Sequence, residues 1–191
     1  MSLKILLVDT DVERAETLEK KLSEAGFARV SRVAGGQDLV AAVEQTAPDL
    51  IIIDMALPDR DTLEDIRLVS ANAPRPIVMF ADKDDPDFVG EAIAAGVCSY
   101  NLSGISSQEV RPIMASAIAL FQRYRHVETE LAAAKAQLEE RRLLERAKAI
   151  LMRNRNMTEP EAYRWLQRKA MNENRKLAHV VAELVKKEES K

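Results

Sequence analysis

Cysteine, histidine, glycine and aromatic residues are scarce in this sequence of 191 residues. Cys98 is the only cysteine, and the two histidines, His126 and His179, lie far apart. The sequence therefore has no cysteine pair for an intramolecular disulfide and no zinc-ligand pattern. It also lacks a glycine-rich phosphate loop and any Ser/His/Asp or Cys/His set for nucleophilic catalysis. These absences argue against an enzyme.

Long apolar runs are also missing. No stretch approaches the ~20 apolar residues that a bilayer-spanning helix needs, and the initial MSLKILLVD has no small-residue cleavage site of a signal peptide. Hydrophobic residues make up 47% and charged residues 31% of the chain, which is the balance of a soluble globular protein. We therefore expect a cytoplasmic protein without a membrane segment.

The formal net charge of −3 combines two unequal parts of the chain. Residues 1–140 contain 14 Lys and Arg against 24 Asp and Glu, whereas residues 141–191 contain 14 against 7. A basic C-terminal segment suggests a polyanionic partner, although basic helix faces are also common where they are merely solvated. Charge alone leaves both readings open.

Short apolar runs alternate with amphipathic stretches in the first 120 residues, which predicts repeated βα units and a parallel sheet. The expected strands are 4–9, 29–33, 50–54, 76–80 and 98–102. Two of them, 5–8 and 50–53, are apolar without alternation, as expected for central strands covered on both faces. The fold class is therefore α/β, with a doubly wound, five-stranded parallel sheet of flavodoxin-like type.

Both of these central strands end in an aspartate, Asp9 and Asp54. In a doubly wound sheet the ligand crevice lies beyond the carboxyl ends of the strands. The two carboxylates are therefore expected to meet there and to form an acidic pocket.

A heptad pattern follows Pro112, with apolar residues at alternating spacings of four and three, which is typical of a paired helix. The seam consists of Ile113, Ala117, Leu120, Tyr124, Val127, Leu131, Ala134 and Leu138. No glycine or proline interrupts residues 113–157, which predicts one helix without a flexible linker. The seam up to residue 120 can pack on its own domain, but residues 127–138 favour a homodimer through this connector helix.

The last segment of the chain is predicted to contain three helices. The first ends near residues 154–156, and TEPEAY then forms a capping box with proline in the first turn. Apolar residues at helical spacing in each helix predict a small shared core.

Residues 1–120 resemble the receiver domain of two-component response regulators. The resemblance is carried by KILLVDTD, APDLIIIDMALPDRD, PIVMFA and AGVCSYNLSG at the first, third, fourth and fifth strands. It implies that Asp54 is the phosphoacceptor, that Asp9 is one of two acids that hold Mg²⁺ together with Asp54, and that a sensor protein binds the domain.

The pocket departs from the receiver pattern at three further positions. Thr10 replaces the second acid, with Asp11 beside it; Ala81 replaces the hydroxyl residue that contacts the phosphoryl group; and Ser103 replaces the lysine that neutralises it. Aspartyl phosphorylation gathers negative charge and needs compensating cations. Two readings stay open: Asp54 is phosphorylated, or the pocket is retained with the fold and a protein partner sets the state.

The C-terminal segment resembles the ANTAR domain of the AmiR and NasT antitermination regulators, through ERAKAILM, TEPEAY, RKAM and NRKLAHVVAEL. RDTLE after Asp54 points further, to the nitrate-assimilation branch. The predicted domains are a receiver-like domain at 1–120, a coiled-coil connector at 121–140 and an ANTAR domain at 141–191. The resemblance implies binding to hairpin RNA in a nascent mRNA leader.

Candidate RNA-binding residues lie on the second helix and at its turn to the third. They are Arg164, Arg168, Lys169, Asn172, Asn174, Arg175 and Lys176, with Tyr163 and Trp165 as platforms on which loop bases could stack. For the two aromatic side chains, packing in the core is the competing interpretation. Two other functions remain as alternatives: a DNA-binding response regulator, or an interaction adaptor without nucleic acid.

Overall fold

The computed structural model describes residues 3–34, 38–57, 59–82 and 85–189. The chain divides into two compact units, Met1–Arg125 and His126–Lys191. The elements in chain order are β1 (Lys4–Asp9), α1 (Val12–Glu24), β2 (Arg29–Ala34), α2 (Leu39–Thr46), β3 (Leu50–Met55), α3 (Arg60–Asn72), β4 (Ile77–Ala81), α4 (Pro86–Ala95), β5 (Ser99–Leu102), α5 (Ser107–Arg155), α6 (Glu159–Asn172) and α7 (Leu177–Glu189).

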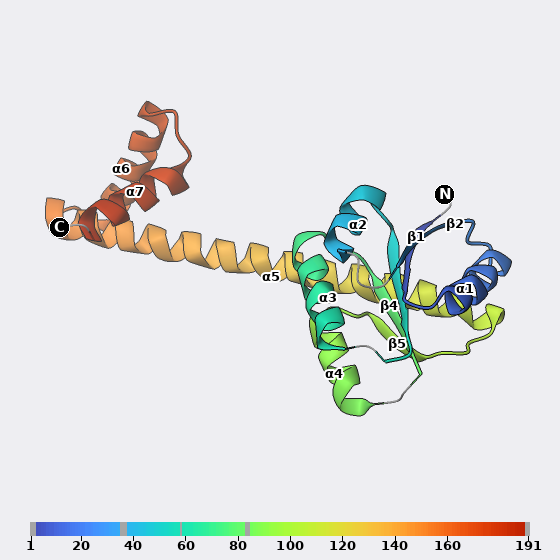
Figure 1. The fold of residues 1–191 in the computed structure, drawn as a ribbon. Helices are drawn as coiled ribbons and strands as arrows, with labels where there is room; N and C mark the ends of the chain where they lie inside the picture. Colours follow the sequence, from blue (N-terminus) through green and yellow to red (C-terminus); the bar gives the residue numbers. More distant parts are fainter. Residues whose placement is uncertain (1–2, 35–37, 58, 83–84, 190–191) are drawn as a thin grey trace. The chain divides into compact units, whose positions relative to one another are not determined.

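The first unit is a parallel sheet with the strand order β2-β1-β3-β4-β5 (Figure 1). The two apolar strands β1 and β3 are neighbours, and Asp9 pairs with Asp54 in their register. The chain therefore brings the carboxyl ends of both strands to one edge, as the strand-end aspartates predict. The doubly wound α/β fold class is confirmed.

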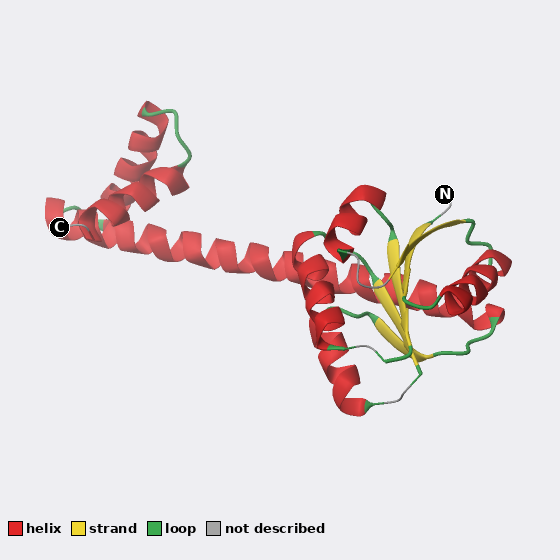
Figure 2. Cartoon of the chain, viewed as in Figure 1, coloured by secondary structure: helices red, strands yellow, loops and turns green. Residues whose placement is uncertain are grey.

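Helices cover both faces of this sheet (Figure 2). Alternate side chains of β1 point to opposite layers: Leu6 and Val8 pack with α2, α3 and α4, whereas Ile5 and Leu7 pack with α1 and the start of α5. Burial on both faces explains why these strands lack a polar alternation. The hydrophobic core lies in these two layers, and the buried carboxylates of Asp9 and Asp54 lie at the carboxyl ends of β1 and β3.

An aspartate caps the N-terminus of each of the first four helices. Asp11, Asp38, Asp59 and Asp85 accept hydrogen bonds from backbone N–H groups in the first turns of α1, α2, α3 and α4, respectively. A carboxylate at this position satisfies free amides and complements the helix dipole. Part of the acidity of this unit therefore has a structural role.

Helix α5 begins earlier than the heptad pattern indicates, at Ser107 and not after Pro112. The carboxylate of Glu109 accepts hydrogen bonds from the backbone N–H and the hydroxyl of Ser106, both at 2.7 Å. This S-x-x-E start fixes the first turn. Pro112 lies in the second turn of α5, where it cannot donate the hydrogen bond to the carbonyl of Gln108, yet the helix continues through it.

The seam of α5 has two environments. Ala117 is buried against the first unit and Ile113 is half-buried there. From Leu120 onward the large seam residues are exposed by between 44% and 63% of their surface; these are Leu120, Tyr124, Val127, Leu131 and Leu138. Within the described ranges, no helix is long and apolar enough to cross a membrane.

The second unit contains the C-terminal half of α5 with α6 and α7. Ala147 and Leu151 of α5 pack with the stripe of α6 and with α7; the α6 stripe consists of Ala162, Leu166 and Ala170. At the start of α6 the carboxylate of Glu161 accepts from the backbone N–H and the hydroxyl of Thr158, at 2.8 and 2.7 Å. Glu161 thus reaches back to the cap residue, as the TEPEAY motif predicts.

Candidate functional site

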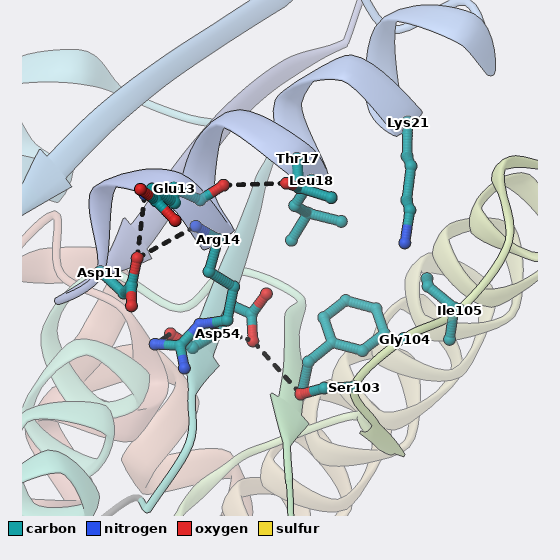
Figure 3. A pocket seen from close by; sticks show the side chains of 11 residues that line it. Asp11, Glu13, Arg14, Thr17, Leu18, Lys21, Asp54, Ser103, Gly104 and Ile105 are labelled. Atoms are coloured by element: carbon teal, nitrogen blue, oxygen red, sulfur yellow. Dashed lines mark hydrogen bonds and ion pairs between the residues drawn. The ribbon is translucent and has the colours of Figure 1, made fainter.

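The acidic pocket of the first unit is built at the ends of β1 and β3. The side chain of Asp9 is fully buried, and that of Asp54 is 7% exposed. Helix α1 and the residues after β5 complete the walls (Figure 3). Two carboxylates at adjacent strand ends, shielded from water, are energetically costly unless a positive charge lies close to them.

Arg14 of α1 supplies that charge. Its Nη2 donates to Asp9 Oδ1 at 2.5 Å and its Nε donates to Asp9 Oδ2 at 3.1 Å, which is the two-pronged pairing of a guanidinium with a carboxylate. Nη2 also lies 3.2 Å from the main-chain oxygen of Asp54, and Nε lies 3.5 Å from Asp54 Oδ1. Figure 3 shows the side chain of Arg14 beside Asp54. One guanidinium therefore bridges both strand ends.

The pKa values of the pocket follow from this geometry. Burial, reinforced by the negative charge of Asp9, raises the pKa of Asp54 to about 6, although Arg14 opposes part of the shift. The hydrogen bond to Asp9 raises the pKa of the Arg14 guanidinium, which therefore stays charged. The ionised form of Asp54 is therefore disfavoured relative to a carboxylate in water.

The other predicted pocket residues have distinct places. Asp11 caps α1 through its carboxylate, and its backbone N–H donates to Asp9 Oδ1 at 2.8 Å. Ala81 is fully buried at the end of β4. The hydroxyl of Ser103 lies 3.5 Å from Asp54 Oδ1, the limit of a hydrogen bond, and Thr10 is exposed beside the pocket. Asp9, Asp54 and Ser103 thus come together, whereas Asp11 is engaged by the helix terminus.

Arg14 is the pocket residue that the sequence pattern did not identify. It lies five residues after Asp9 and three after the cap residue Asp11, so the first turn of α1 carries it back over the strand ends. A basic residue one helical turn after a strand-end acid is the signal that could have indicated it.

The second unit forms a basic module, which presents one exposed face on α6. Arg164, Gln167, Arg168 and Met171 follow one another at helical spacing and, together with Glu161, line a shallow surface pocket. Arg164 and Arg168 are exposed, and Met171 is 79% exposed. In the described part of the chain, no acidic side chain forms an ion pair with either arginine. Gln167 and Met171 were absent from the sequence-based set, although their i, i+3 and i+4 relation to the arginines places them on this face.

Several other candidate residues are engaged within the module. Lys169 pairs with Glu173 at 3.0 Å, and Arg175 pairs with Glu173 and with Glu183, at 3.1 and 2.6 Å. Asn172, Asn174 and Lys176 are exposed around the α6–α7 turn, where Asn174 has a positive φ of 49°. A left-handed conformation at this position is one that asparagine adopts readily.

The two aromatic candidates differ in environment. Trp165 packs partly against the module core, and its ring has the Arg155 guanidinium at 4.5 Å and the Lys169 ammonium at 5.6 Å from its centroid. These cation–π contacts occupy surface that a nucleobase would need. Tyr163 is 38% exposed and so retains accessible ring surface.

Two protein-family models match the chain. The response regulator receiver domain matches residues 5–111, and the ANTAR domain matches residues 132–185. The first match covers the sheet and the acidic pocket, and the second covers the core and the basic face of the second unit. Both are regulatory families.

Two curated relatives match the chain over different lengths. The transcriptional regulatory protein PdtaR of Mycobacterium tuberculosis is 31% identical over 183 residues, which cover 94% of this chain and 89% of PdtaR. The DNA-binding response regulator MtrA of Mycobacterium leprae is 30% identical over 110 residues, 58% of this chain and 48% of MtrA.

The similarity to solved structures concerns the fold. A response regulator from Thermotoga maritima aligns with a TM-score of 0.56 and 17% identity, over 62% of this chain and 99% of its own. The signal receiver domain of a modulated diguanylate cyclase from Desulfovibrio desulfuricans aligns with the same TM-score and 20% identity, over 65% and 99%. With a receiver fold followed by an ANTAR domain, and with a relative that matches across both, this chain belongs to the ANTAR-domain response regulators of the AmiR/NasT type.

Proposed function

We propose that this protein is a transcription antitermination regulator that binds hairpin RNA through α6 and the α6–α7 turn, under the control of a protein that binds its receiver domain. The observation that carries the proposal is the exposed basic face of α6 inside the segment that matches the ANTAR domain. Arg164 donates from its Nε to the main-chain oxygen of Pro160 at 3.2 Å, and neither Arg164 nor Arg168 forms an ion pair among the described residues, so both guanidinium groups can contact phosphates.

Within this face the residues have different tasks. Arg164 and Arg168 contact phosphates, and Gln167 and the asparagines of the turn offer the donors and acceptors that read unstacked loop bases. Tyr163 is the aromatic side chain with accessible surface for stacking. Lys169 and Arg175 mainly hold the module together, because their charges are already paired.

A direct test compares a hairpin RNA with duplex DNA of equal length at one near-physiological salt concentration. We expect the hairpin to bind more tightly, and the Arg164→Ala/Arg168→Ala double variant to lose binding. Arg67→Ala removes a surface arginine of α3 and is the matched control, which should bind like the wild type. Equal affinity for both polymers would contradict the proposal and favour a DNA-binding regulator. If the wild type binds neither the hairpin RNA nor the duplex DNA, an interaction adaptor without nucleic acid would be favoured.

The exposed seam of α5 supports a homodimer as the RNA-binding form. Leu120, Tyr124, Val127, Leu131 and Leu138 leave an apolar stripe in water, and a second copy of the same stripe would cover it. Two modules presented together would grip two linked hairpins with a gain in effective concentration. Sedimentation equilibrium of the full chain measures this state.

Control by a protein partner fits the substitutions in the pocket. Ala81 lacks the hydroxyl and Ser103 the ammonium that stabilise an aspartyl phosphate. We expect no mass increase when the protein is incubated with a small phosphodonor and Mg²⁺. Stoichiometric phosphorylation that disappears in Asp54→Asn would contradict this and show that Asp54 is a working phosphoacceptor.

The nitrate-assimilation branch stays a prediction, motivated by the RDTLE that follows Asp54. Neighbouring genes for a nitrate-sensing protein and for a nitrate or nitrite reductase would support it. Neighbours of another pathway would assign the same mechanism to a different operon.

A further inference from the structure

The receiver resemblance implies Mg²⁺ at the acidic pocket, and the donor atoms there decide whether the ion fits. Mg²⁺ requires near-octahedral oxygen ligands at ~2.0–2.1 Å. Asp9, the first acid, has both oxygens engaged by Arg14, and Oδ1 also accepts from the backbone N–H of Asp11. Among the described residues, no group of three or more His, Cys, Asp or Glu side chains is arranged to hold a metal.

The neighbouring acids do not make up the missing ligands. The carboxylate of Asp11 accepts from the backbone N–H groups of Glu13 and Arg14, at 2.9 and 3.1 Å, so turning it toward the pocket would uncap α1. Thr10 offers a neutral hydroxyl where a typical receiver has a carboxylate. Of the acids at this end of the sheet, Asp54 keeps carboxylate oxygens outside short hydrogen bonds, and Asp11 keeps only Oδ2, because its Oδ1 is held by the first-turn amides of α1.

Arg14 lies in the pocket although the dipole of α1 disfavours a cation at this position. It is the third residue of α1, and cations are disfavoured in the first turn because the N-terminus is the positive end of the helix dipole. Its side chain is nevertheless turned inward, 22% exposed, and paired with a fully buried carboxylate. The attraction of two buried carboxylates outweighs the dipole.

We propose that Arg14 is the resident cation of this pocket, and that its guanidinium takes the place of a divalent metal between Asp9 and Asp54. A metal ion would have to break both Arg14–Asp9 hydrogen bonds and would leave the guanidinium against a second cation. The pocket is therefore charge-compensated by the protein alone and does not bind Mg²⁺ at cellular concentrations. This inference rests on pocket geometry and is independent of RNA binding.

Mn²⁺ binding to the full-length protein tests the inference, because bound Mn²⁺ loses the sharp electron paramagnetic resonance signal of the free ion. We expect the wild type to leave millimolar Mn²⁺ free. Arg14→Met keeps the aliphatic stem but removes the charge, and should bind Mn²⁺ at least about tenfold more tightly than the wild type. Arg67→Met, on the surface of α3, is the control and should behave like the wild type.

A second variant and a second measurement distinguish a real change in metal binding from misfolding of one variant. Arg14→Gln should gain Mn²⁺ binding as Arg14→Met does, and Mg²⁺ should raise the melting temperature of both variants but not of the wild type. Arg14→Lys keeps the charge and should still exclude the ion. Mn²⁺ binding by the wild type would overturn the inference. Failure of both Arg14→Met and Arg14→Gln to bind would also overturn it, since Arg14 would then not be the excluding group.

Discussion

At the residue scale, Asp54 carries the charge that Arg14 leaves unbalanced. One guanidinium faces two carboxylates, and the two shortest hydrogen bonds that Arg14 donates both go to Asp9. Asp54 keeps a 3.5 Å ion pair and a 3.5 Å contact with the Ser103 hydroxyl. The protonation of this one side chain therefore responds to pH near neutrality.

The stability of the receiver domain should depend on pH through Asp54. Because its pKa is raised to about 6, the folded state binds this proton more tightly than the unfolded chain. The corresponding stabilisation is present below the unfolded pKa and is lost as the pH rises through about 6. Asp54→Asn has no ionisable group at this position and escapes this loss. The difference in free energy of unfolding between the variant and the wild type should therefore grow in favour of the variant, by up to about 3 kcal/mol, from about pH 4 to about pH 7.

Urea denaturation at a series of pH values measures this difference. Glu64→Gln, which removes an exposed carboxylate of α3, is the control and should follow the wild type. A constant difference between Asp54→Asn and the wild type across the series would show that Asp54 ionises normally.

Two adjacent basic residues of α6, one on its exposed basic face and one beside Trp165, should differ in their effect on RNA affinity. Arg168 is exposed and open to phosphate, whereas Lys169 is engaged with Glu173 and with the ring of Trp165. We expect Arg168→Ala to weaken hairpin binding about tenfold and Lys169→Ala to weaken it less. Fluorescence anisotropy of a labelled hairpin measures both. A larger loss for Lys169→Ala would place the RNA on the Trp165 side of the helix.

The residues of the pocket were partly predictable. Asp9 and Asp54 end two apolar strands, and parallel strands bring such ends together, so their proximity followed from the pattern. The role of Arg14 did not, because a long side chain on an amphipathic helix normally points to water. Only the buried charges at the strand ends turn it inward.

At the element scale, the boundaries of all five expected strands agree with the structure to within one residue, and α5 ends where the pattern predicts, although it starts earlier. Continuous apolar runs predicted the strands of the first unit, and the TEPEAY motif predicted the start of α6, whereas the four capping aspartates were not used as a signal. The sequence pattern places the start of α5 too late, because proline usually marks a helix boundary. The cap formed by Ser106 and Glu109 lies one and a half turns earlier.

Thr158 sets the start of α6 and, with it, the position of the basic face. Its backbone N–H and hydroxyl both donate to Glu161. Thr158→Ala should lower the stability of the second unit by about 1 kcal/mol, the usual cost of a lost N-cap. Thermal unfolding followed by circular dichroism, with Thr158→Ser as the conservative control, measures it. An unchanged melting temperature would indicate that Pro160 and Glu161 alone define the helix start.

At the scale of the whole molecule, dimerisation and RNA binding should be coupled through the seam of α5. Leu131→Asp places a charge within the apolar stripe and should yield monomers, because two buried carboxylates would face each other in the dimer. Affinity for a two-hairpin RNA should then fall on the order of a hundredfold, while affinity for a single hairpin should change little.

Ala133→Asp is the matched control, since residue 133 is exposed on the same helix but off the seam. It should remain dimeric and retain its RNA affinity. Monomeric Leu131→Asp with full affinity for the two-hairpin RNA would separate oligomerisation from recognition.

The unbroken course of α5 from Ser107 to Arg155 constrains how this protein can evolve. The seam returns to the same side of the helix only after a whole heptad, so an insertion of seven residues between Tyr124 and Leu138 would preserve the stripe. An insertion of three or four residues would retain a heptad-like spacing at the cost of a local change in winding. One or two inserted residues would rotate the later seam residues away from the earlier ones. Related proteins should therefore differ in the length of this helix by seven, or by three or four, residues. The loops of the receiver domain can instead lengthen one residue at a time.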